Sequence, residues 1–380
     1  MDKRRTMIPV SKPSIGAEEL KAIEHVFKSG WLGMGSVVKE FEDAVASFIG
    51  GEPLPYVVAV NTGTTAMHIA LSALGVGAGD EVIIPSLTFV ATAQIVTATG
   101  ATPVFCDIEE DTLNINVNNL EGCITKKTKA IIPVHYRGFP CSMSAILNIA
   151  RNNNIIVVED AAHAFGSFYQ GKKIGSFGDI TCFSFDPIKT ITCGEGGVVI
   201  TRDKKIYESV VRKRILGIDK DTWSRYKNER SWSYDVIEQG YRYHMSNINA
   251  AIGLVQIKKF EQLNKRKIDI AKRYDEEFAH MEGLSLLRTG YEDIGLFTYI
   301  IKVKNRRDEL MAHLKENGIG SGIHYTPVHH FTYYKNFLRN PLPATDKVYE
   351  QILTLPLYPD MTDEEAGLVI KGIQSFFSKS

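Results

Sequence analysis

The chain has 380 residues, and its 44 lysines and arginines balance 44 aspartates and glutamates, so the formal net charge is zero. This balance excludes a global electrostatic basis for binding nucleic acid or an anionic membrane. The five cysteines are an odd number without a CxxC pair, which argues against a disulfide framework or a zinc site and favours reduced thiols in a cytoplasmic protein. We also expect no secretory signal and no membrane span, because no apolar run is long enough.

Short apolar runs follow one another through the first part of the chain, and helix-like segments such as 64–75 separate them. The runs lack polar alternation, so they predict strands buried on both faces of a mostly parallel sheet that helices cover. They lie at 56–60, 81–85, 102–108, 130–134 and 155–160.

After residue 160 the pattern of apolar runs alternating with helix-like segments changes. Two close runs, 180–185 and 196–201, predict an antiparallel pair, and a long amphipathic helix is expected from about Ile248 through 278. After Gly283 a strand at 296–304 and a helix at 307–318 predict a smaller α+β region. We therefore expect an N-terminal segment with a large α/β domain over 1–250, and the long helix with a small domain over 251–380. The helix can bridge both parts, so this boundary is approximate.

Ligands of open parallel sheets bind at the carboxyl ends of the strands, and one candidate there is Thr62-Gly63-Thr64-Thr65. It lies between a predicted strand and a predicted helix. Backbone N–H groups at a helix start, with hydroxyls nearby, can bind a phosphate. The alternative, favoured for this turn alone, is that a threonine only caps the helix.

A second candidate is Glu159-Asp160, which ends an apolar strand three residues before His163. A carboxylate in such a position needs a cationic partner, and a protonated pyridine nitrogen would serve. Without other signals, an N-cap aspartate and a core histidine are the favoured alternatives.

The third candidate is Lys189, which follows the strand that carries Ser184 and precedes a Gly-Glu-Gly-Gly turn. A lysine that forms a Schiff base must lose its proton readily, and Ser184 could donate to a phosphate. Alone, Lys189 is more simply a surface lysine. Together, the phosphate turn, the acid and the lysine are the anchor, the ring-nitrogen partner and the carbonyl partner that pyridoxal 5′-phosphate requires.

Many further stretches match one family in the same order. On them the chain resembles the DegT/DnrJ/StrS-type sugar-nucleotide aminotransferases over nearly its whole length. The resemblance implies the aspartate-aminotransferase-like fold of fold-type-I pyridoxal-phosphate enzymes. The matching stretches are "IPVSKPSIGAEEL", "SGWLGMGSVVKEFE", "TGTTAMHIAL", "PSLTFVATAQ", "TPVFCDI", "PVHYRG", "VEDAAHAFGS", "FSFDPIKTITCGEGG", "MSNINAAIGLVQI", "IHYTPVH" and "LPLYP".

The resemblance also implies roles for single residues. Lys189 corresponds to the Schiff-base lysine and proton carrier, Asp160 to the partner of the pyridine nitrogen, and His163 to a residue near the phenolic oxygen. The phosphate ligands are then Gly63, Thr64, Thr65 and Ser184. Phe89 corresponds to an aromatic residue that stacks on the cofactor ring, and the less favoured alternative is a core phenylalanine.

Two segments depart from the family. In "GYRYHMS", Arg242 replaces the asparagine that reaches the phosphate in the neighbouring subunit, and an arginine can still bind phosphate there. The segment 211–235 is basic and rich in aromatic residues. It predicts either a solvated loop, which we favour, or a clamp for a nucleotide diphosphate.

The resemblance implies transfer of an amino group, usually from glutamate, to a nucleotide-linked keto sugar through pyridoxamine phosphate as the half-reaction form. This chemistry belongs to deoxyamino sugar biosynthesis, including that of lipopolysaccharide O-antigens. The Gly-Glu-Gly-Gly turn favours C4 of a 4-keto-6-deoxyhexose, and a homodimer with shared sites is expected. Trp31 and His324 are candidates for substrate contact. The alternatives are amination at C3 or of a cyclitol ketone, a dehydratase, which would normally lack Lys189, and a regulator.

Overall fold

The computed structural model describes residues 7–219, 234–288 and 290–378. Most of the segment 211–235, for which the sequence predicts a loop or a nucleotide clamp, therefore lies outside the described residues. None of the helices in the described ranges combines the length and the apolarity that crossing a bilayer requires.

A seven-stranded sheet forms the larger part of the molecule, with the order β1-β9-β8-β5-β4-β2-β3. Only β9 runs against its neighbours β1 and β8; the remaining pairs are parallel, as the sequence predicts. The strands are β1 (Tyr56–Val60), β2 (Glu81–Pro85), β3 (Thr102–Cys106), β4 (Thr128–Ile131), β5 (Ile156–Asp160), β8 (Ile180–Ser184) and β9 (Gly197–Thr201).

The structure shortens two of these strands at their carboxyl ends: the strand predicted at 102–108 ends at Cys106, and β4 also ends early. The sequence predicts a strand at 130–134, whereas β4 ends at Ile131. Pro133 has no N–H for the ladder, and only its carbonyl oxygen continues the pairing, by accepting from the N–H of Asp160 at 2.9 Å. The consequence is a short irregular segment beside the end of β5.

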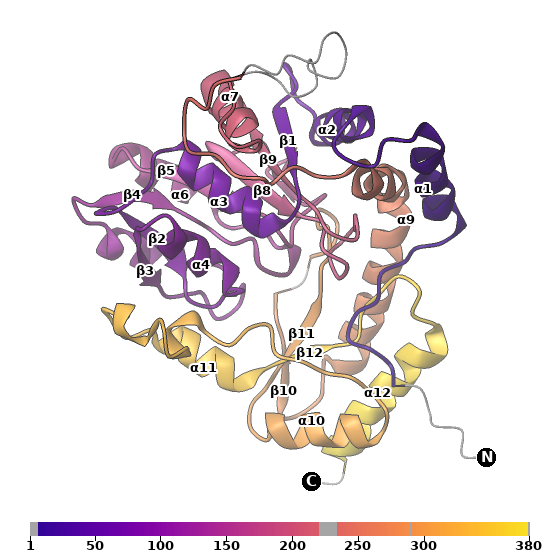
Figure 1. Ribbon diagram of the computed structural model, residues 1–380. Helices are drawn as coiled ribbons and strands as arrows, with labels where there is room; N and C mark the ends of the chain where they lie inside the picture. The colour runs from indigo at the N-terminus through magenta and orange to yellow at the C-terminus, as the bar shows by residue number, and fades with distance from the viewer. Residues whose placement is uncertain (1–6, 220–233, 289, 379–380) are drawn as a thin grey trace.

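Helices cover this sheet and connect its strands (Figure 1). Their apolar faces join the cores on the two sides of the sheet, which are built mainly from Val, Ile, Leu and Phe side chains. The helices and short turns are α1 (Ala17–Ser29), α2 (Ser36–Ile49), α3 (Gly63–Ala73), α4 (Ala91–Ala98), α5 (Val117–Leu120), η1 (Glu121–Cys123), η2 (Tyr136–Gly138), α6 (Met143–Asn152) and α7 (Lys204–Lys213), with the small hairpin β6 (Phe168–Tyr169) and β7 (Lys172–Lys173).

The long helix α9 (Asn247–Phe278) connects this part to a three-stranded antiparallel sheet of order β10-β11-β12 (Figure 1). In its first half Gln256 donates to Glu19 of α1, and in its second half Tyr274 donates to the carbonyl of Pro356. The remaining elements are β10 (Leu284–Leu286), β11 (Tyr299–Val303), α10 (Arg307–Glu316), η3 (Val328–His330), η4 (Lys335–Phe337), α11 (Pro343–Gln351), β12 (Ile352–Leu355) and α12 (Asp363–Phe377). The division of the chain at residue 250 stays a prediction.

Candidate active site

A cavity of about 210 Å³ lies where the ends of β5 and β8 meet the start of α3. Most of the residues singled out in the sequence line it, although they are far apart in the chain. These residues are Gly63, Thr64, Phe89, Asp160, His163, Ser184 and Lys189. The three candidate motifs therefore meet in one place.

The start of α3 forms one wall of this cavity. Thr62 caps the helix by accepting from the N–H of Thr65 at 3.1 Å. The first N–H groups of a helix have no partner within the helix, and together with the helix dipole they favour an anion. A Cβ at Gly63 would lie 2.6 Å from the Cβ of Ser184, so only glycine lets the helix start approach β8 this closely.

Thr65 does not line the cavity. Its hydroxyl accepts from the N–H of Thr62 at 3.1 Å and donates to the side-chain oxygen of Asn61 at 2.7 Å. The capping alternative thus describes both Thr62 and Thr65, while Gly63, Thr64 and Ser184 face the cavity. A phosphate contact of Thr65 stays a prediction.

The two adjacent carboxylates at the end of β5 have different surroundings, because successive side chains of a strand point to opposite faces. Glu159 is fully buried and accepts from Gly178 N–H, Thr181 Oγ1 and His135 Nε2 at 2.7, 2.6 and 2.9 Å. The protein itself therefore satisfies Glu159.

Asp160 faces the cavity instead. It accepts from Thr92 Oγ1 at 2.8 Å and from the N–H of Ala162 at 3.1 Å. Burial raises the pKa of Asp160, while these two hydrogen bonds and the charge of Lys189 act in the opposite direction. A cation in the cavity would favour the charged carboxylate, so Asp160 is suited to a protonated ring nitrogen.

His163 lies in an aromatic environment. Its ring stacks on Phe297, with centroids 4.2 Å apart and an interplanar angle of 12°, and its Nε2 lies 3.0 Å from the hydroxyl of Tyr325. Burial, with smaller contributions from Lys189 and His324, holds the pKa of His163 well below its usual value, so the ring is neutral. Its Nδ1 is buried and has no partner among the described residues, which leaves it available to a ligand.

Lys189 lies in the turn after β8. The carboxylate of Asp186 accepts from the N–H of Ile188 at 3.1 Å, and the N–H of Lys189 donates to the carbonyl of Asp186 at 3.0 Å, which orders this turn. The Nζ atom lies 4.5 Å from the centroid of Phe297. Burial lowers the pKa of Lys189, and Asp186 and Asp160 offset only part of this effect. The amine therefore loses its proton more readily than an exposed lysine.

Three other predicted residues lie outside the cavity lining. Trp31 borders a separate hollow of about 760 Å³ between α1, α2 and α9, and its Nε1 donates to the carbonyl of Met34. Arg242 is exposed on the segment before α9. His324 bonds through Nδ1 to Thr354 Oγ1 at 2.9 Å, and burial together with the charge of Lys189 lowers its pKa to about 4. Their ligand contacts stay predictions.

Thr92, Tyr325 and Phe297 contact the predicted site residues but had no predicted role themselves. Thr92 and Tyr325 lie in the recognised stretches "PSLTFVATAQ" and "IHYTPVH", so the motif was visible in the sequence but the contact was not. Phe297 contacts both His163 and Lys189, but in the sequence it is only one residue of the predicted strand 296–304. Its contacts with the site become visible only in the folded structure, where the C-terminal part packs against the segments that follow β5 and β8.

The fold and this set of residues define a pyridoxal-phosphate-dependent aminotransferase of fold type I. The family model of the DegT/DnrJ/EryC1/StrS aminotransferase family matches residues 13–374, and the chain belongs to this family. The chain is 39% identical to the spore coat polysaccharide biosynthesis protein SpsC of Bacillus subtilis over 98% of both chains.

Two solved structures are also similar along the whole chain. Spr1654 from Streptococcus pneumoniae, in its pyridoxamine phosphate form, has a TM-score of 0.91 and 32% identity, covering 98% of this chain and 99% of its own. The same protein is also solved in a pyridoxal phosphate form. The sugar aminotransferase CalS13 from Micromonospora echinospora has a TM-score of 0.88 and 31% identity, covering 97% and 100%.

The residues present fit pyridoxal phosphate. The helix start with its obligatory glycine suits the phosphate, and Asp160 suits the ring nitrogen. The unpartnered Nδ1 of His163 suits a polar atom on the ring, and Lys189 suits the aldehyde. Pyridoxal phosphate is the cofactor of this enzyme.

Proposed function

We propose that the enzyme transfers the amino group of L-glutamate to C4 of a nucleotide-linked 4-keto-6-deoxyhexose. The observation that carries this proposal is Lys189, an amine of lowered pKa that shares one cavity with an anion-binding helix start and Asp160. The names of CalS13 as a sugar aminotransferase and of SpsC in polysaccharide biosynthesis support a sugar substrate. The Gly-Glu-Gly-Gly turn after Lys189 supports C4, and the product would serve deoxyamino sugar biosynthesis such as that of O-antigens.

When bound, pyridoxal phosphate supplies an electron sink for the carbon that loses or gains the amino group. Gly63 and Thr64 would hold its phosphate through backbone N–H groups, and the hydroxyl of Ser184 would add a donor. Asp160 would hold a proton on the ring nitrogen, and the hydrogen bond from Thr92 fixes the orientation of that carboxylate.

The Nζ atom of Lys189 would take the proton from the substrate carbon and return it during the transfer. A lowered pKa suits this role, because a base acts best when its pKa lies close to the working pH. Phe297 and Tyr325 contact the Lys189–His163 side of the cavity and reduce the access of water to the amine.

The cavity within one chain is too small for a cofactor together with a sugar nucleotide, because even a drug-sized ligand occupies a pocket of at least about 300 Å³. The substrate must therefore extend beyond it. We expect a homodimer in the cytoplasm, in which the exposed Arg242 reaches the partner's cofactor phosphate, and we assign substrate contact to Trp31 and His324.

The cofactor chemistry is tested first. The purified protein supplied with pyridoxal phosphate should be yellow, and borohydride should fix the cofactor on Lys189, as peptide mapping would show. A protein that stays colourless refutes the assignment of Lys189. Lys189→Ala is the matched control and should not be labelled at the cavity.

The substrate is tested separately, with dTDP-, UDP- and GDP-linked 3-keto and 4-keto sugars and glutamate as the donor. Amination of 4-keto sugars supports the proposal. Amination of 3-keto sugars alone assigns the reaction to C3 instead of C4, and loss of water without amination identifies a dehydratase.

A further inference from the structure

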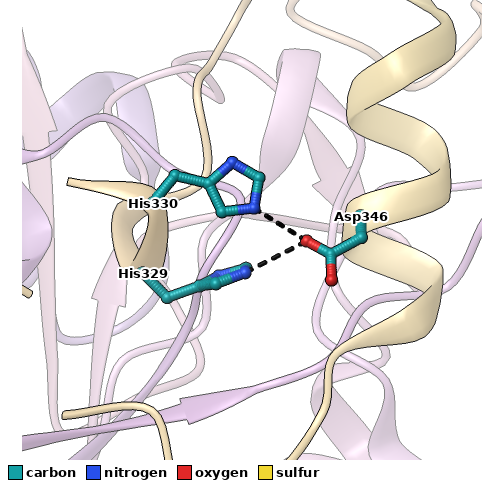
Figure 2. Close-up of side chains that lie close together, drawn as sticks. All are labelled: His329, His330 and Asp346. Atoms are coloured by element: carbon teal, nitrogen blue, oxygen red, sulfur yellow. Dashed lines mark hydrogen bonds and ion pairs between the residues drawn. The ribbon is translucent and has the colours of Figure 1, made fainter. Parts of the chain in front are cut away.

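Two histidines and an aspartate meet on the C-terminal part of the chain, away from Lys189. His329 and His330 lie in η3, and Asp346 lies in the first turn of α11. Both Nε2 atoms point at the same carboxylate oxygen of Asp346, at 3.0 and 2.9 Å (Figure 2). The three donor atoms lie within 4.8 Å of one another, and this cluster is separate from the cofactor cavity.

We propose that His329, His330 and Asp346 form a binding site for a divalent transition metal ion, with Zn²⁺ as the ion that the donor set fits best. Two imidazole nitrogens and one carboxylate are a known zinc ligand set that leaves one position for water. The ligand atoms around tetrahedral zinc are about 3.3–3.5 Å apart, so the two hydrogen-bonded separations need to widen by only a few tenths of an ångström. The expectation of no zinc site came from the cysteines, which take no part here.

The exposure of the three side chains is suited to an ion with an open coordination position. The side chain of His329 is only 5% exposed, whereas those of His330 and Asp346 are 35% and 50% exposed. The surrounding protein holds the buried His329 in place, while His330 and Asp346 can be reached by an ion from solvent. In Figure 2 the second oxygen of the Asp346 carboxylate points away from both rings, so Asp346 offers one oxygen atom to the ion.

A hydrogen bond behind the cluster orients His329. Its Nδ1 lies 2.7 Å from Ser86 Oγ, and the same oxygen accepts from the backbone N–H of His329 at 3.2 Å. Metal-binding histidines commonly use their second nitrogen in this way, which fixes the ring and the tautomer. A hydroxyl both donates and accepts, so Ser86 can serve His329 with or without a metal ion.

The bound ion would connect two segments that pack on the active site. On one side it holds α11, and on the other it holds η3, whose Val328 N–H donates to the carbonyl of Ser86 at 2.8 Å. Ser86 begins the loop that brings Phe89 to the cofactor cavity, and Tyr325 precedes η3 and lines the same cavity. The metal ion would therefore stabilise the segments that form one side of the cofactor cavity, and it would take no part in amino transfer.

Zinc binding tests the proposal directly. The metal-free holoenzyme is dialysed to remove free pyridoxal phosphate, which itself binds metal ions, and titrated with ZnCl₂ by calorimetry. We expect one saturable site per chain and a higher melting temperature with Zn²⁺. Mg²⁺, which prefers oxygen ligands, should do neither. Co²⁺ should give the visible bands of a tetrahedral site with nitrogen ligands.

Variants then locate the ion. His330→Ala and Asp346→Asn should each weaken binding more than about tenfold, and Ser86→Ala by about 10- to 100-fold. His280→Ala removes an exposed histidine outside the cluster and should bind Zn²⁺ as the wild type does. An unchanged yellow colour of His330→Ala shows that the fold and the cofactor are intact. Two results would overturn the proposal: no saturable Zn²⁺ site in the wild type, or Zn²⁺ binding by His330→Ala and Asp346→Asn that equals that of the wild type. The cluster would then be a hydrogen-bonded contact only.

Discussion

The two neighbouring carboxylates of β5 should respond differently when each becomes an amide. Asp160→Asn removes the charge that faces the cavity, whereas Glu159→Gln removes one that only the protein contacts. We expect Asp160→Asn to lose amino transfer and to stay folded, and Glu159→Gln to lose stability and to keep its cofactor chemistry. The two changes are chemically matched, so each is the control for the other.

The magnitudes follow from the contacts. A contact ion pair at an effective dielectric constant of about 20 contributes about 4 kcal/mol, which corresponds to about a thousandfold in rate for Asp160→Asn. In Glu159→Gln the new NH₂ group must face either the Nε2–H of His135 or the donors Gly178 and Thr181. His135 cannot change tautomer freely, because its Nδ1 accepts from the N–H of Cys141 at 3.0 Å. One unsatisfied donor and weaker remaining bonds cost about 2–4 kcal/mol.

Turnover is measured with glutamate as the donor, and stability by urea unfolding of the apoproteins. Cofactor binding is followed by visible absorbance. The reasoning is refuted if Asp160→Asn retains turnover within tenfold of the wild type, or if Glu159→Gln loses turnover to the same extent while its unfolding midpoint is unchanged.

Three further predictions follow from single contacts. Because the pKa of Lys189 is lowered in the folded protein, the unfolded chain binds more protons than the folded chain between this pKa and 10.5. The free energy of unfolding of the apoprotein should therefore rise with pH in that window. Lys189→Met should abolish this rise when urea unfolding is measured as a function of pH. Glu42→Ala should cost about 3–5 kcal/mol in urea unfolding, because it leaves the buried Arg214, 2.6 Å away, without its ion-pair partner; a change within 1 kcal/mol contradicts this. Gly63→Ala should lower cofactor affinity in absorbance titrations through the 2.6 Å approach to the Cβ of Ser184, and an affinity equal to that of the wild type argues against the clash.

The sequence predicts the large sheet well, because continuous apolar runs have few other uses than buried strands. It also predicts Lys189 and Asp160, because Asp160 ends β5, Lys189 lies in the turn after β8, and the carboxyl ends of parallel strands meet at one edge. The local chemistry of these positions follows from neighbours in sequence.

Other features depend on contacts between distant segments. Nothing near Asp160 predicts its bond with Thr92, and nothing near His163 predicts its stacking on Phe297. The cluster of His329 and His330 with Asp346 is hidden for the same reason, because fifteen residues, which include the short helix η4, separate the aspartate from the second histidine. The role of Thr65 was ambiguous, since a capping hydroxyl and a phosphate-binding hydroxyl occupy the same place in a sequence.

The position of Phe297 and Tyr325 has a consequence for how the enzyme matures. The phosphate-binding turn, Asp160 and Lys189 all precede α9, whereas the two rings that enclose His163 come after it. A nascent chain that ends before α9 would carry the reactive groups but leave the amine open to water, with its pKa nearer to that of a free lysine. The environment that lowers the pKa of Lys189 is therefore complete only when the segments after α9 pack against the strands that carry the reactive groups.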